Sequence, residues 1–216
     1  MIDAITFIRL NSQRVPYKSI KELNGIPLCN YALRAMNDVP EIDDIIVYVS
    51  DENVCKYIDD SIRYTFKKRP SFLDSNSATF NNIMDYAINL IDSEHVLYFC
   101  VTSPFMKPET ISEMINKVIN EDYDSAFTVK EIKNFCWFKG APLNYNPNSI
   151  PFTQDLEPIL VETSSLYIFE KDLYRKTKRR IGFKPYIRRV GIIEGHDIDY
   201  PEDFKIAEYF IKSDLI

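Results

Sequence analysis

The sequence predicts an α/β fold in which a mainly parallel sheet is covered by helices on both faces, giving three layers. Apolar, β-rich stretches alternate with stretches whose apolar residues recur at helical spacing, which is typical of βαβ units. The 216 residues are 45% hydrophobic and 13% aromatic, which is enough for one substantial core. At this length we expect a single domain, spanning residues 1–216.

The alternation can be followed along the chain. Extended segments are expected at Ala4–Leu10, Asp43–Ser50, His95–Val101, Asp124–Ile132 and Ser164–Asp172. Helices are expected at Pro27–Met36, Glu52–Asp60, Ala78–Ile91, Lys107–Ile119 and Pro201–Leu215. The almost continuous apolar character of His95–Val101 favours a strand that is covered on both faces.

The regular alternation stops after Ile132. Trp137 and several prolines then lie among Asn-rich turns between extended pieces, up to about residue 170. We interpret residues 133–170 as an inserted region of strands and loops that offers a surface for a homodimer.

Charge and hydropathy limit the possible partners. The net charge of -6 argues against a general nucleic-acid binder, because affinity for the phosphate backbone depends on a basic surface. No stretch approaches the roughly 18 apolar residues of a membrane-spanning helix, and the N-terminus lacks the layout of a signal peptide. We therefore expect a soluble, cytoplasmic protein with no nucleic-acid or membrane partner.

Cysteine and histidine usage excludes several kinds of site. The 4 cysteines are widely spaced and form no C-x-x-C pattern, so we expect buried thiols and neither a zinc site nor a disulfide framework. With 2 histidines in the chain, a His-rich metal site is excluded and a Ser-His-Asp triad is not supported.

Two carboxylates near the C-terminus, Asp197 and Asp199, flank a single apolar residue. One interpretation is helix capping, because Asp199 precedes Pro201 and Glu202 follows it at capping-box spacing. Capping leaves Asp197 without a role. In an extended segment both side chains point the same way, and two hard oxygen donors suit Mg²⁺ or Mn²⁺.

The loop after the first expected strand is basic although the chain as a whole is acidic. It carries Arg9, Arg14, Lys18 and Lys21, with Ser12 among them. Guanidinium, ammonium and hydroxyl groups in one loop can bind phosphate oxygens, although such a cluster alone is also typical of a solvated surface. The loop contains neither the G-x-G-x-x-G pattern of dinucleotide sites nor the G-x-x-x-x-G-K-[ST] pattern of P-loops. Ligands of such sheets bind at the carboxyl ends of the strands, so this loop, the loop after His95–Val101 and the Asp pair should share one rim.

Five stretches, in order, resemble the CMP-acylneuraminate synthetase family, which is itself similar to the CMP-Kdo synthetases. The first has the pattern R-x-x-S-x-x-x-P-x-K-x-x-x-x-L-x-G-x-P-L. The five stretches are Arg9–Leu28, Arg69–Thr79, Val101–Phe105, Thr153–Pro158 with the following Leu166–Phe169, and Asp197–Glu208. The resemblance covers almost the whole chain and implies a Rossmann-like fold of the nucleotide-diphospho-sugar transferase type.

The resemblance implies a transfer of CMP from CTP to an acidic, sialic-type sugar, with release of pyrophosphate, by a homodimer that uses Mg²⁺ or Mn²⁺. The catalytic residues would be Arg9, Lys18 and Asp199. The nucleotide would be bound by Arg9, Ser12, Arg14, Lys18, Arg69, Ala78 and Thr79, and the metal by Asp197 and Asp199.

The acceptor half of the site departs from the family pattern. Cys100 and Thr163 stand where the family has Gln and Asn, and the basic residue that usually precedes Q-D-L is replaced by Phe152 or Thr153. The residues that the resemblance still places at the acceptor are Cys100, Thr102, Gln154, Thr163, Tyr167, Phe183, Lys184 and Arg188. Lys184 and Arg188 are the candidates for the missing carboxylate contact.

These departures leave alternatives open. The same nucleotide chemistry is compatible with another acidic acceptor, such as a phosphonate or an unusual keto acid. A catalytically degenerate nucleotide-binding homologue is a further alternative. The D-x-D pattern also occurs at the metal site of GT-A glycosyltransferases, but there it normally follows a middle strand.

Overall fold

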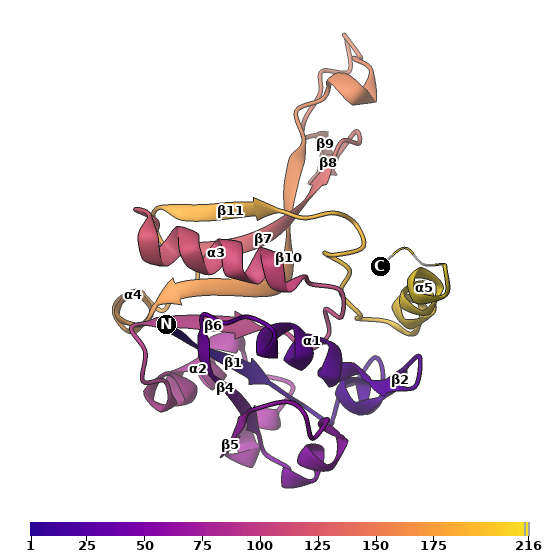
Figure 1. Ribbon diagram of the computed structural model, residues 1–216. Helices are drawn as coiled ribbons and strands as arrows, with labels where there is room; N and C mark the ends of the chain where they lie inside the picture. Colours follow the sequence, from indigo (N-terminus) through magenta and orange to yellow (C-terminus); the bar gives the residue numbers. More distant parts are fainter. Residues whose placement is uncertain (214, 216) are drawn as a thin grey trace.

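A seven-stranded sheet forms the centre of the computed structural model, which describes residues 1–213 and 215 (Figure 1). Its strand order is β11-β7-β10-β6-β1-β4-β5. The strands are β1 (Ile2–Phe7), β4 (Ile42–Val49), β5 (Thr65–Lys68), β6 (His95–Phe99), β7 (Ser125–Ile132), β10 (Ile159–Glu170) and β11 (Pro185–Arg189). Only β10 runs antiparallel to its neighbours β6 and β7, so the prediction of a mainly parallel sheet is confirmed.

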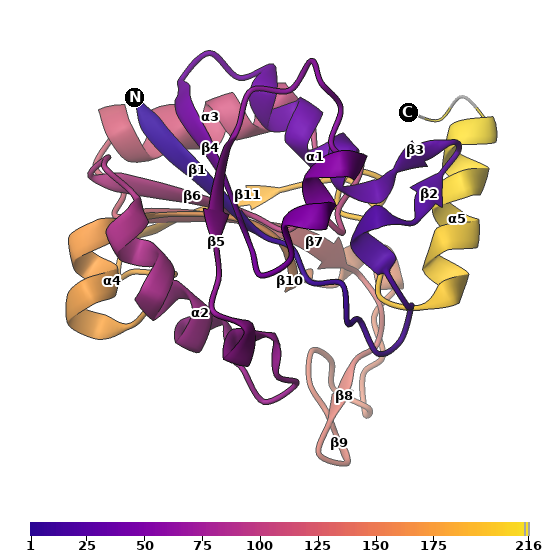
Figure 2. The ribbon, with the colours of Figure 1, turned by 90° about the horizontal axis from the view of Figure 1, so that it is seen from below.

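Helices cover both faces of this sheet, as expected (Figures 1 and 2). One face packs against α1 (Leu28–Asn37) and α3 (Pro108–Asn120), and the other against α2 (Phe80–Ala87) and α4 (Lys171–Thr177). Successive side chains of β1 point to opposite faces of the sheet. Ile2 and Ala4 therefore pack in the core with α1 and α3, and Ile5 packs in the core with α2 and α4. The last helix, α5 (Pro201–Lys212), lies beyond the end of the sheet beside β2 (Glu22–Leu23).

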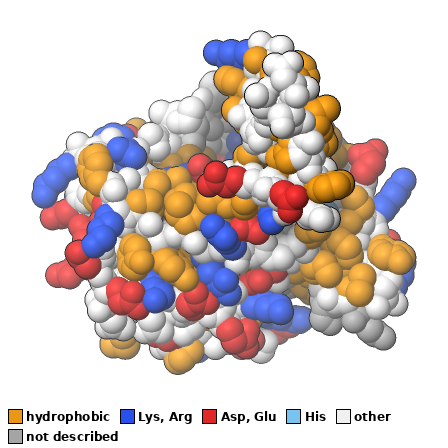
Figure 3. Space-filling view, turned by 90° about the horizontal axis from the view of Figure 1, so that it is seen from above, with side chains coloured by type: hydrophobic (Ala, Val, Ile, Leu, Met, Phe, Trp, Pro, Cys, Tyr) orange, Lys and Arg blue, Asp and Glu red, His pale blue; other side chains and the backbone are white. Residues whose placement is uncertain are grey.

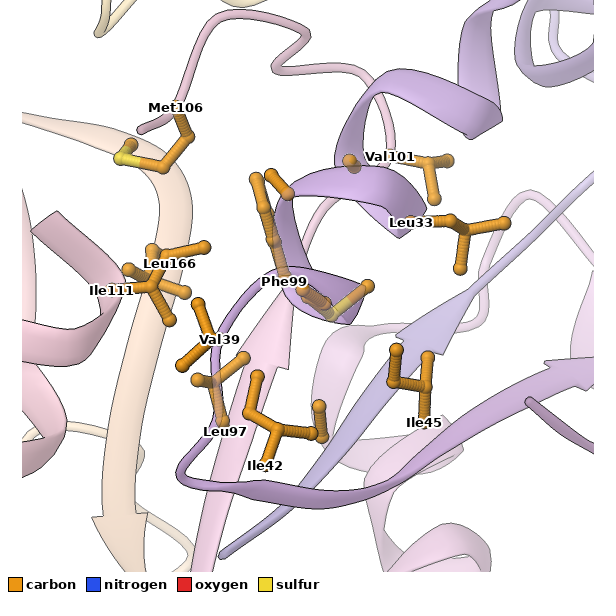
Figure 4. Close-up of a cluster of buried hydrophobic side chains, with 14 of the residues drawn as sticks. Leu33, Val39, Ile42, Ile45, Leu97, Phe99, Val101, Met106, Ile111 and Leu166 are labelled. Atoms are coloured by element: carbon orange, nitrogen blue, oxygen red, sulfur yellow. The ribbon is translucent and has the colours of Figure 1, made fainter. Parts of the chain in front are cut away.

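The core between the sheet, α1 and α3 contains aliphatic and aromatic side chains from elements far apart in the sequence (Figure 4). Leu33 of α1 and Ile111 of α3 pack with Leu97 and Phe99 of β6, and all four side chains are fully buried. Burial of this kind contributes roughly 1.5–3 kcal/mol for each large side chain. The core holds β1 and β6 side by side, and both strands lead into the candidate site.

The remaining short elements differ in part from the sequence predictions. The helix expected at Glu52–Asp60 is a 3-10 helix, η2 (Glu52–Tyr57), because only Val54 in it is buried and no apolar stripe supports an α-helix. The other short elements are η1 (Lys18–Ile20), η3 (Ser71–Asp74), η4 (Ile88–Leu90), β3 (Ile26–Pro27), β8 (Trp137–Phe138), β9 (Ala141–Pro142) and η5 (Thr153–Asp155).

An arm formed by residues 133–158 projects away from the sheet between β7 and β10 (Figure 1). It carries β8, β9 and η5. The sequence interpretation extended this insertion to about residue 170, but Ile159–Glu170 form the long strand β10 in the middle of the sheet. The boundary moves because Leu166–Phe169 are buried and pair with β6, and Tyr167–Phe169 also pair with β7.

Two further expectations concern cysteines and membrane segments. The four cysteines are free thiols, of which Cys29 is buried and the others are half-buried. Burial raises the pKa of Cys29 to about 12. Within residues 1–213 and 215, no helix has the length and apolar character needed to cross a membrane.

Candidate active site

A cavity of about 500 Å³ opens where β1 and β6 end, on the face of the sheet that carries α2. The three loops expected to share one rim all contribute to its wall. Its polar and charged lining includes Arg9, Ser12, Gln13, Arg14 and Lys18 from the first loop, Asn76 before α2, Cys100 and Thr102 after β6, and Asp197 and Asp199. This volume is typical of a site for a small ligand.

The apolar residue between the two carboxylates determines how they are placed. Ile198 is fully buried and packs with Val15 of the first loop and Phe204 of α5. Its backbone N–H donates to the Thr102 carbonyl at 2.9 Å. Because Ile198 is anchored from both sides, Asp197 and Asp199 reach the same cavity although the segment is not a β-strand.

Asp197 lies against the end of β6. Its Oδ1 accepts hydrogen bonds from Thr102 Oγ1 at 2.5 Å and from Ser103 Oγ at 3.3 Å. Burial raises the pKa of Asp197, and the neighbouring Asp199 adds to this shift, while the Thr102 hydroxyl and Lys18 oppose it. A desolvated carboxylate beside a second one favours the approach of a cation.

Asp199 connects the first loop to the C-terminal segment. Its Oδ1 accepts from Arg14 at 2.7 Å and lies 3.2 Å from Lys18 Nζ. Lys18 Nζ also donates to the Ile198 carbonyl at 2.5 Å. Two cations of the basic loop therefore contact Asp199 directly.

The capping interpretation of Asp199 is wrong. The carboxylate at the start of α5 is that of Asp203, whose Oδ2 accepts the backbone N–H of Asp199 at 2.8 Å and of Tyr200 at 2.7 Å. The sequence spacing was ambiguous, because α5 begins one residue later than an Asp199 cap requires. The Asp199 carboxylate therefore does not cap α5, and it lines the cavity.

The residues around the Asp pair fit a Mg²⁺ or Mn²⁺ ion that receives part of its coordination from a substrate. No cluster of three or more His, Cys, Asp or Glu side chains occurs in the part of the chain that the structure describes. Two carboxylates with a phosphate-binding loop beside them are the donor set that Mg²⁺ commonly uses, with phosphate oxygens and water completing the octahedron.

Arg9 joins the first loop to the segment before α2. Its guanidinium donates to the Asp74 carbonyl and to Asn76 Oδ1, both at 3.1 Å, and it lines the cavity. Ala78 lines the cavity as well. Thr79 instead caps α2 through a capping box with Asn82.

Arg69, which the resemblance places at the nucleoside, has its side chain inside the protein. Its guanidinium is fully buried and donates to the Ile8 carbonyl at 2.8 Å, the Tyr48 carbonyl at 3.2 Å and Asp74 Oδ1 at 2.5 Å. Arg69 therefore holds the segment 70–79 against β1 and β4 and does not line the cavity.

The expected acceptor residues divide into two groups. Cys100 and Thr102 line the cavity. Thr163 is buried and its Oγ1 lies 2.5 Å from Thr128 Oγ1, so the next residue, Ser164, faces the cavity instead. Ser164 has φ 60° in an irregular part of β10. This irregular backbone explains why Ser164, and not Thr163, faces the cavity.

Four of the expected acceptor residues lie away from the cavity in this chain. Gln154 is exposed on the arm, and Phe183 is exposed beneath the Arg179 guanidinium. Lys184 is hydrogen-bonded to Asp122, and Arg188 Nε lies 3.0 Å from Glu113 of α3, on the opposite face of the sheet. The two candidate partners for an acceptor carboxylate are therefore already paired elsewhere.

Other lining residues were not expected from the sequence. They include Phe7, Asn76, Phe80, Tyr98, Ser164 and Arg180. Arg180 stands over the ring of Tyr167, an expected acceptor residue that is itself buried. Burial raises the pKa of Tyr167, whose hydroxyl donates to Glu162 Oε2 at 2.7 Å. No sequence pattern marks Arg180, because it stands in a run of basic residues that resembles an ordinary surface.

The chain is similar to a protein-family model, to curated proteins and to solved structures. The cytidylyltransferase family model matches residues 4–213. N-acylneuraminate cytidylyltransferase A of Danio rerio is 27% identical over 215 residues, which cover 96% of this chain and 50% of that protein. The chain thus spans about half the length of the curated relatives it matches.

Two solved structures share the fold at low sequence identity. CMP:2-keto-3-deoxy-manno-octonic acid synthetase in complex with CTP superposes with a TM-score of 0.73 at 11% identity, covering 98% of both chains. The 4-diphosphocytidyl-2C-methyl-D-erythritol synthase of Anaerococcus prevotii gives 0.67 at 18% identity, covering 98% of this chain and 96% of that one. Together with the family match over almost the whole sequence, these findings show that the chain belongs to the cytidylyltransferase family.

Proposed function

We propose that this chain transfers CMP from CTP to an acidic, sialic-type sugar and releases pyrophosphate, as a step in surface-glycan biosynthesis. The observation that carries the proposal is the meeting of Arg14 and Lys18 of the basic loop with Asp199 at one cavity. Phosphoryl and nucleotidyl transfer depend mainly on positioning and on charge neutralisation, which such a site supplies. The family membership and the N-acylneuraminate-specific names of the relatives support the same reaction.

In the proposed reaction a hydroxyl oxygen of the acceptor bonds to the α-phosphorus of CTP, and the hydroxyl proton is released to solvent. The bond between this phosphorus and the bridging oxygen breaks, and pyrophosphate leaves with the electron pair. Arg9, Ser12, Arg14 and Lys18 line the cavity where they can bind the triphosphate oxygens. The Lys18 side chain is only 12% exposed, so its charge is screened less by solvent than that of a surface lysine.

Asp197 and Asp199, which line the same cavity, would hold a divalent cation. When bound, it would neutralise phosphate charge and lower the pKa of the acceptor hydroxyl. Asp197 is held for this role by Thr102 and Ser103. The ion pairs of Asp199 with Arg14 and Lys18 bring both cations to the edge of the same site.

A second proposal keeps the nucleotide chemistry and changes the acceptor to another acid, such as a phosphonate or an unusual keto acid. The specific observation that favours it is the composition of the acceptor side, where Cys100 and Ser164 line the cavity. A small thiol and a hydroxyl form fewer hydrogen bonds than the amide side chains of the family pattern, and such changes alter which ligand fits.

We further propose that the active protein is a cytoplasmic homodimer that uses the arm as its interface. Large apolar side chains are exposed on the arm, among them Trp137, Phe138, Ile150 and Phe152. Figure 3, which looks down on the arm, shows hydrophobic side chains along it. Exposed apolar groups gathered on one projection are typical of an interaction surface.

The test of the function is pyrophosphate release with Mg²⁺ in the presence of CTP, UTP, ATP or GTP. The acceptor panel contains sialic, legionaminic, pseudaminic and Kdo-type acids together with a phosphonate. We expect release with CTP and at least one acid. A signal with a phosphonate alone would favour the second proposal, and silence without CTP binding in calorimetry would contradict both.

Two substitutions test the proposed machinery. We expect Lys18→Ala and Asp199→Ala each to lower kcat by about 100-fold or more, the loss seen when one charge-stabilising group is removed. Lys117→Ala on α3 and Asp43→Ala in β4 are matched controls, because neither residue lines the cavity. Full turnover in either cavity variant, with circular dichroism unchanged, would refute the assigned roles.

A further inference from the structure

Arg180 is the charged group of the cavity that the family pattern leaves unexplained. It lies in the loop between α4 and β11 and lines the cavity. Its guanidinium carbon is 3.8 Å from the ring centre of Tyr167 and 4.9 Å from that of Phe80. Contacts with two aromatic rings hold the planar guanidinium and leave its N–H edge available.

The donors of Arg180 are largely unused by the protein. Across residues 1–213 and 215, the Arg180 guanidinium forms no hydrogen bond, and its one carboxylate neighbour is Glu162 Oε2 at 3.9 Å. Glu162 is 44% exposed and already accepts the Tyr167 hydroxyl, so this contact is a weak ion pair. Arg9, Arg14 and Lys18, in contrast, each bond to protein oxygens.

The position of Arg180 separates it from the predicted triphosphate site. The first loop follows β1, whereas Arg180 stands on Tyr167 of β10, and β6 lies between these strands. Two strand spacings amount to about 10 Å. Tyr98 of β6 forms the floor between the two ends, and both Arg180 and Asp197 influence its pKa, which burial raises. The cavity thus has one cationic end for phosphates and a second one beside it.

We infer that Arg180 binds the carboxylate of the acceptor acid and selects for acidic acceptors. This inference rests on the proposed function. A planar guanidinium whose N–H edge is free matches a carboxylate in a two-point hydrogen-bonded pair. Stacking on Phe80 and Tyr167 reduces the side-chain entropy lost when the ligand binds. Arg180 thereby takes the role for which the sequence offered Lys184 and Arg188, both paired outside the cavity.

The test compares acids with neutral analogues in Arg180→Met, Arg180→Lys and the wild type. The probes are N-acetylneuraminate and its C1 carboxamide, together with any acid that is active in the panel. For Arg180→Met we expect the acceptor KM to rise about 10- to 100-fold, the effect of losing one charge-assisted pair. The KM for CTP should stay within about twofold. Arg175→Met on α4 is the matched control, because Arg175 contacts Asp172 and Asn89 outside the cavity.

The preference for acid over carboxamide distinguishes binding from a purely structural role. The wild type should prefer the acid, and Arg180→Met should lose that preference, whereas a destabilised protein would lose both ligands equally. Arg180→Lys retains the charge and should retain part of the preference, which keeps the test valid if the Met variant folds poorly.

Each contrary outcome has a separate meaning. An unchanged acceptor KM in Arg180→Met would overturn the inference while the proposed function stands. A parallel rise in the KM for CTP would also overturn it, because Arg180 would then belong to the nucleotide site. If the wild type turns over no acceptor, saturation-transfer NMR with N-acetylneuraminate decides: binding lost in Arg180→Met supports the inference, and no binding to the wild type overturns it.

Discussion

Asp197 carries a conflict between stability and function at the scale of a single residue. Its carboxylate is buried beside Asp199, and burial raises its pKa above that of an exposed Asp. A carboxyl whose pKa is higher in the folded than in the unfolded chain opposes folding at neutral pH. This destabilisation fades as the pH falls through the folded pKa towards the unfolded one.

The first prediction therefore concerns Asp197→Asn. The amide oxygen can still accept from Thr102 and Ser103, while the buried charge is removed. At pH 7 and without metal we expect a Tm higher by roughly 2–4 °C, the shift that about 1 kcal/mol produces in a chain of this size. Differential scanning calorimetry as a function of pH measures it, and the gain should shrink at acid pH.

The same variant supplies its own functional control. Mg²⁺ and CTP together should raise the Tm of the wild type, because a ligand that binds only the folded state stabilises it. Asp197→Asn should show little of this rise and should lose most pyrophosphate release. A variant that is less stable than the wild type at pH 7 would contradict the account of the buried charge.

At the scale of elements, Arg69 connects three strands and one loop. It follows β5, donates to carbonyls of Ile8 and Tyr48 at the ends of β1 and β4, and pairs with Asp74 of η3. The Tyr48 ring lies 5.8 Å from the guanidinium carbon. Arg69 is thus the fully buried anchor of the loop that carries Ala78 and Asn76 to the cavity, and Arg9 adds hydrogen bonds from the cavity side.

The second prediction is that Arg69→Met lowers the free energy of unfolding by about 3 kcal/mol, because two carbonyls and a carboxylate lose their buried partner. Urea denaturation measures the change. Lys68→Met, at the exposed neighbouring residue, should stay within about 0.5 kcal/mol of the wild type. A loss below about 1 kcal/mol for Arg69→Met would show that the loop is held by other contacts.

At the scale of the whole molecule, the arm is the feature that the body of the protein does not need for its own packing. Phe138 and Phe152 are 61% and 75% exposed. If these side chains form the proposed dimer interface, replacing them removes association without removing core contacts.

The third prediction is that Phe138→Ser combined with Phe152→Ser converts a dimer to a monomer in sedimentation velocity. At low protein concentration the Tm of this variant should lie within about 2 °C of the wild-type Tm. Tyr209→Ser is the matched control, because Tyr209 is 64% exposed on α5, away from the arm. A wild type that sediments as a monomer at micromolar concentration would contradict the dimer proposal itself.

Much of the fold was predictable because it follows from local patterns. Helical spacing in Lys107–Ile119 and the apolar run His95–Val101 predicted α3 and β6 nearly to their observed ends. The basic loop and the Asp pair were predictable as partners, because the carboxyl ends of parallel strands share one edge of the sheet. The inserted region was recognised, but its end was misplaced because β10 continues directly from it.

Local sequence patterns were enough to predict the fold class, the family resemblance and the basic-loop and Asp residues that line one side of the cavity. Which side chains reach the cavity and which form contacts inside the protein depends on the tertiary structure. Thr163 and Arg69 form hydrogen bonds inside the protein and do not line the cavity, whereas Ser164 and Arg180 do line it. The physical reason is that hydrogen bonds such as Thr163 to Thr128 and stacking such as Arg180 on Phe80 join residues far apart in the chain, and no local spacing records them.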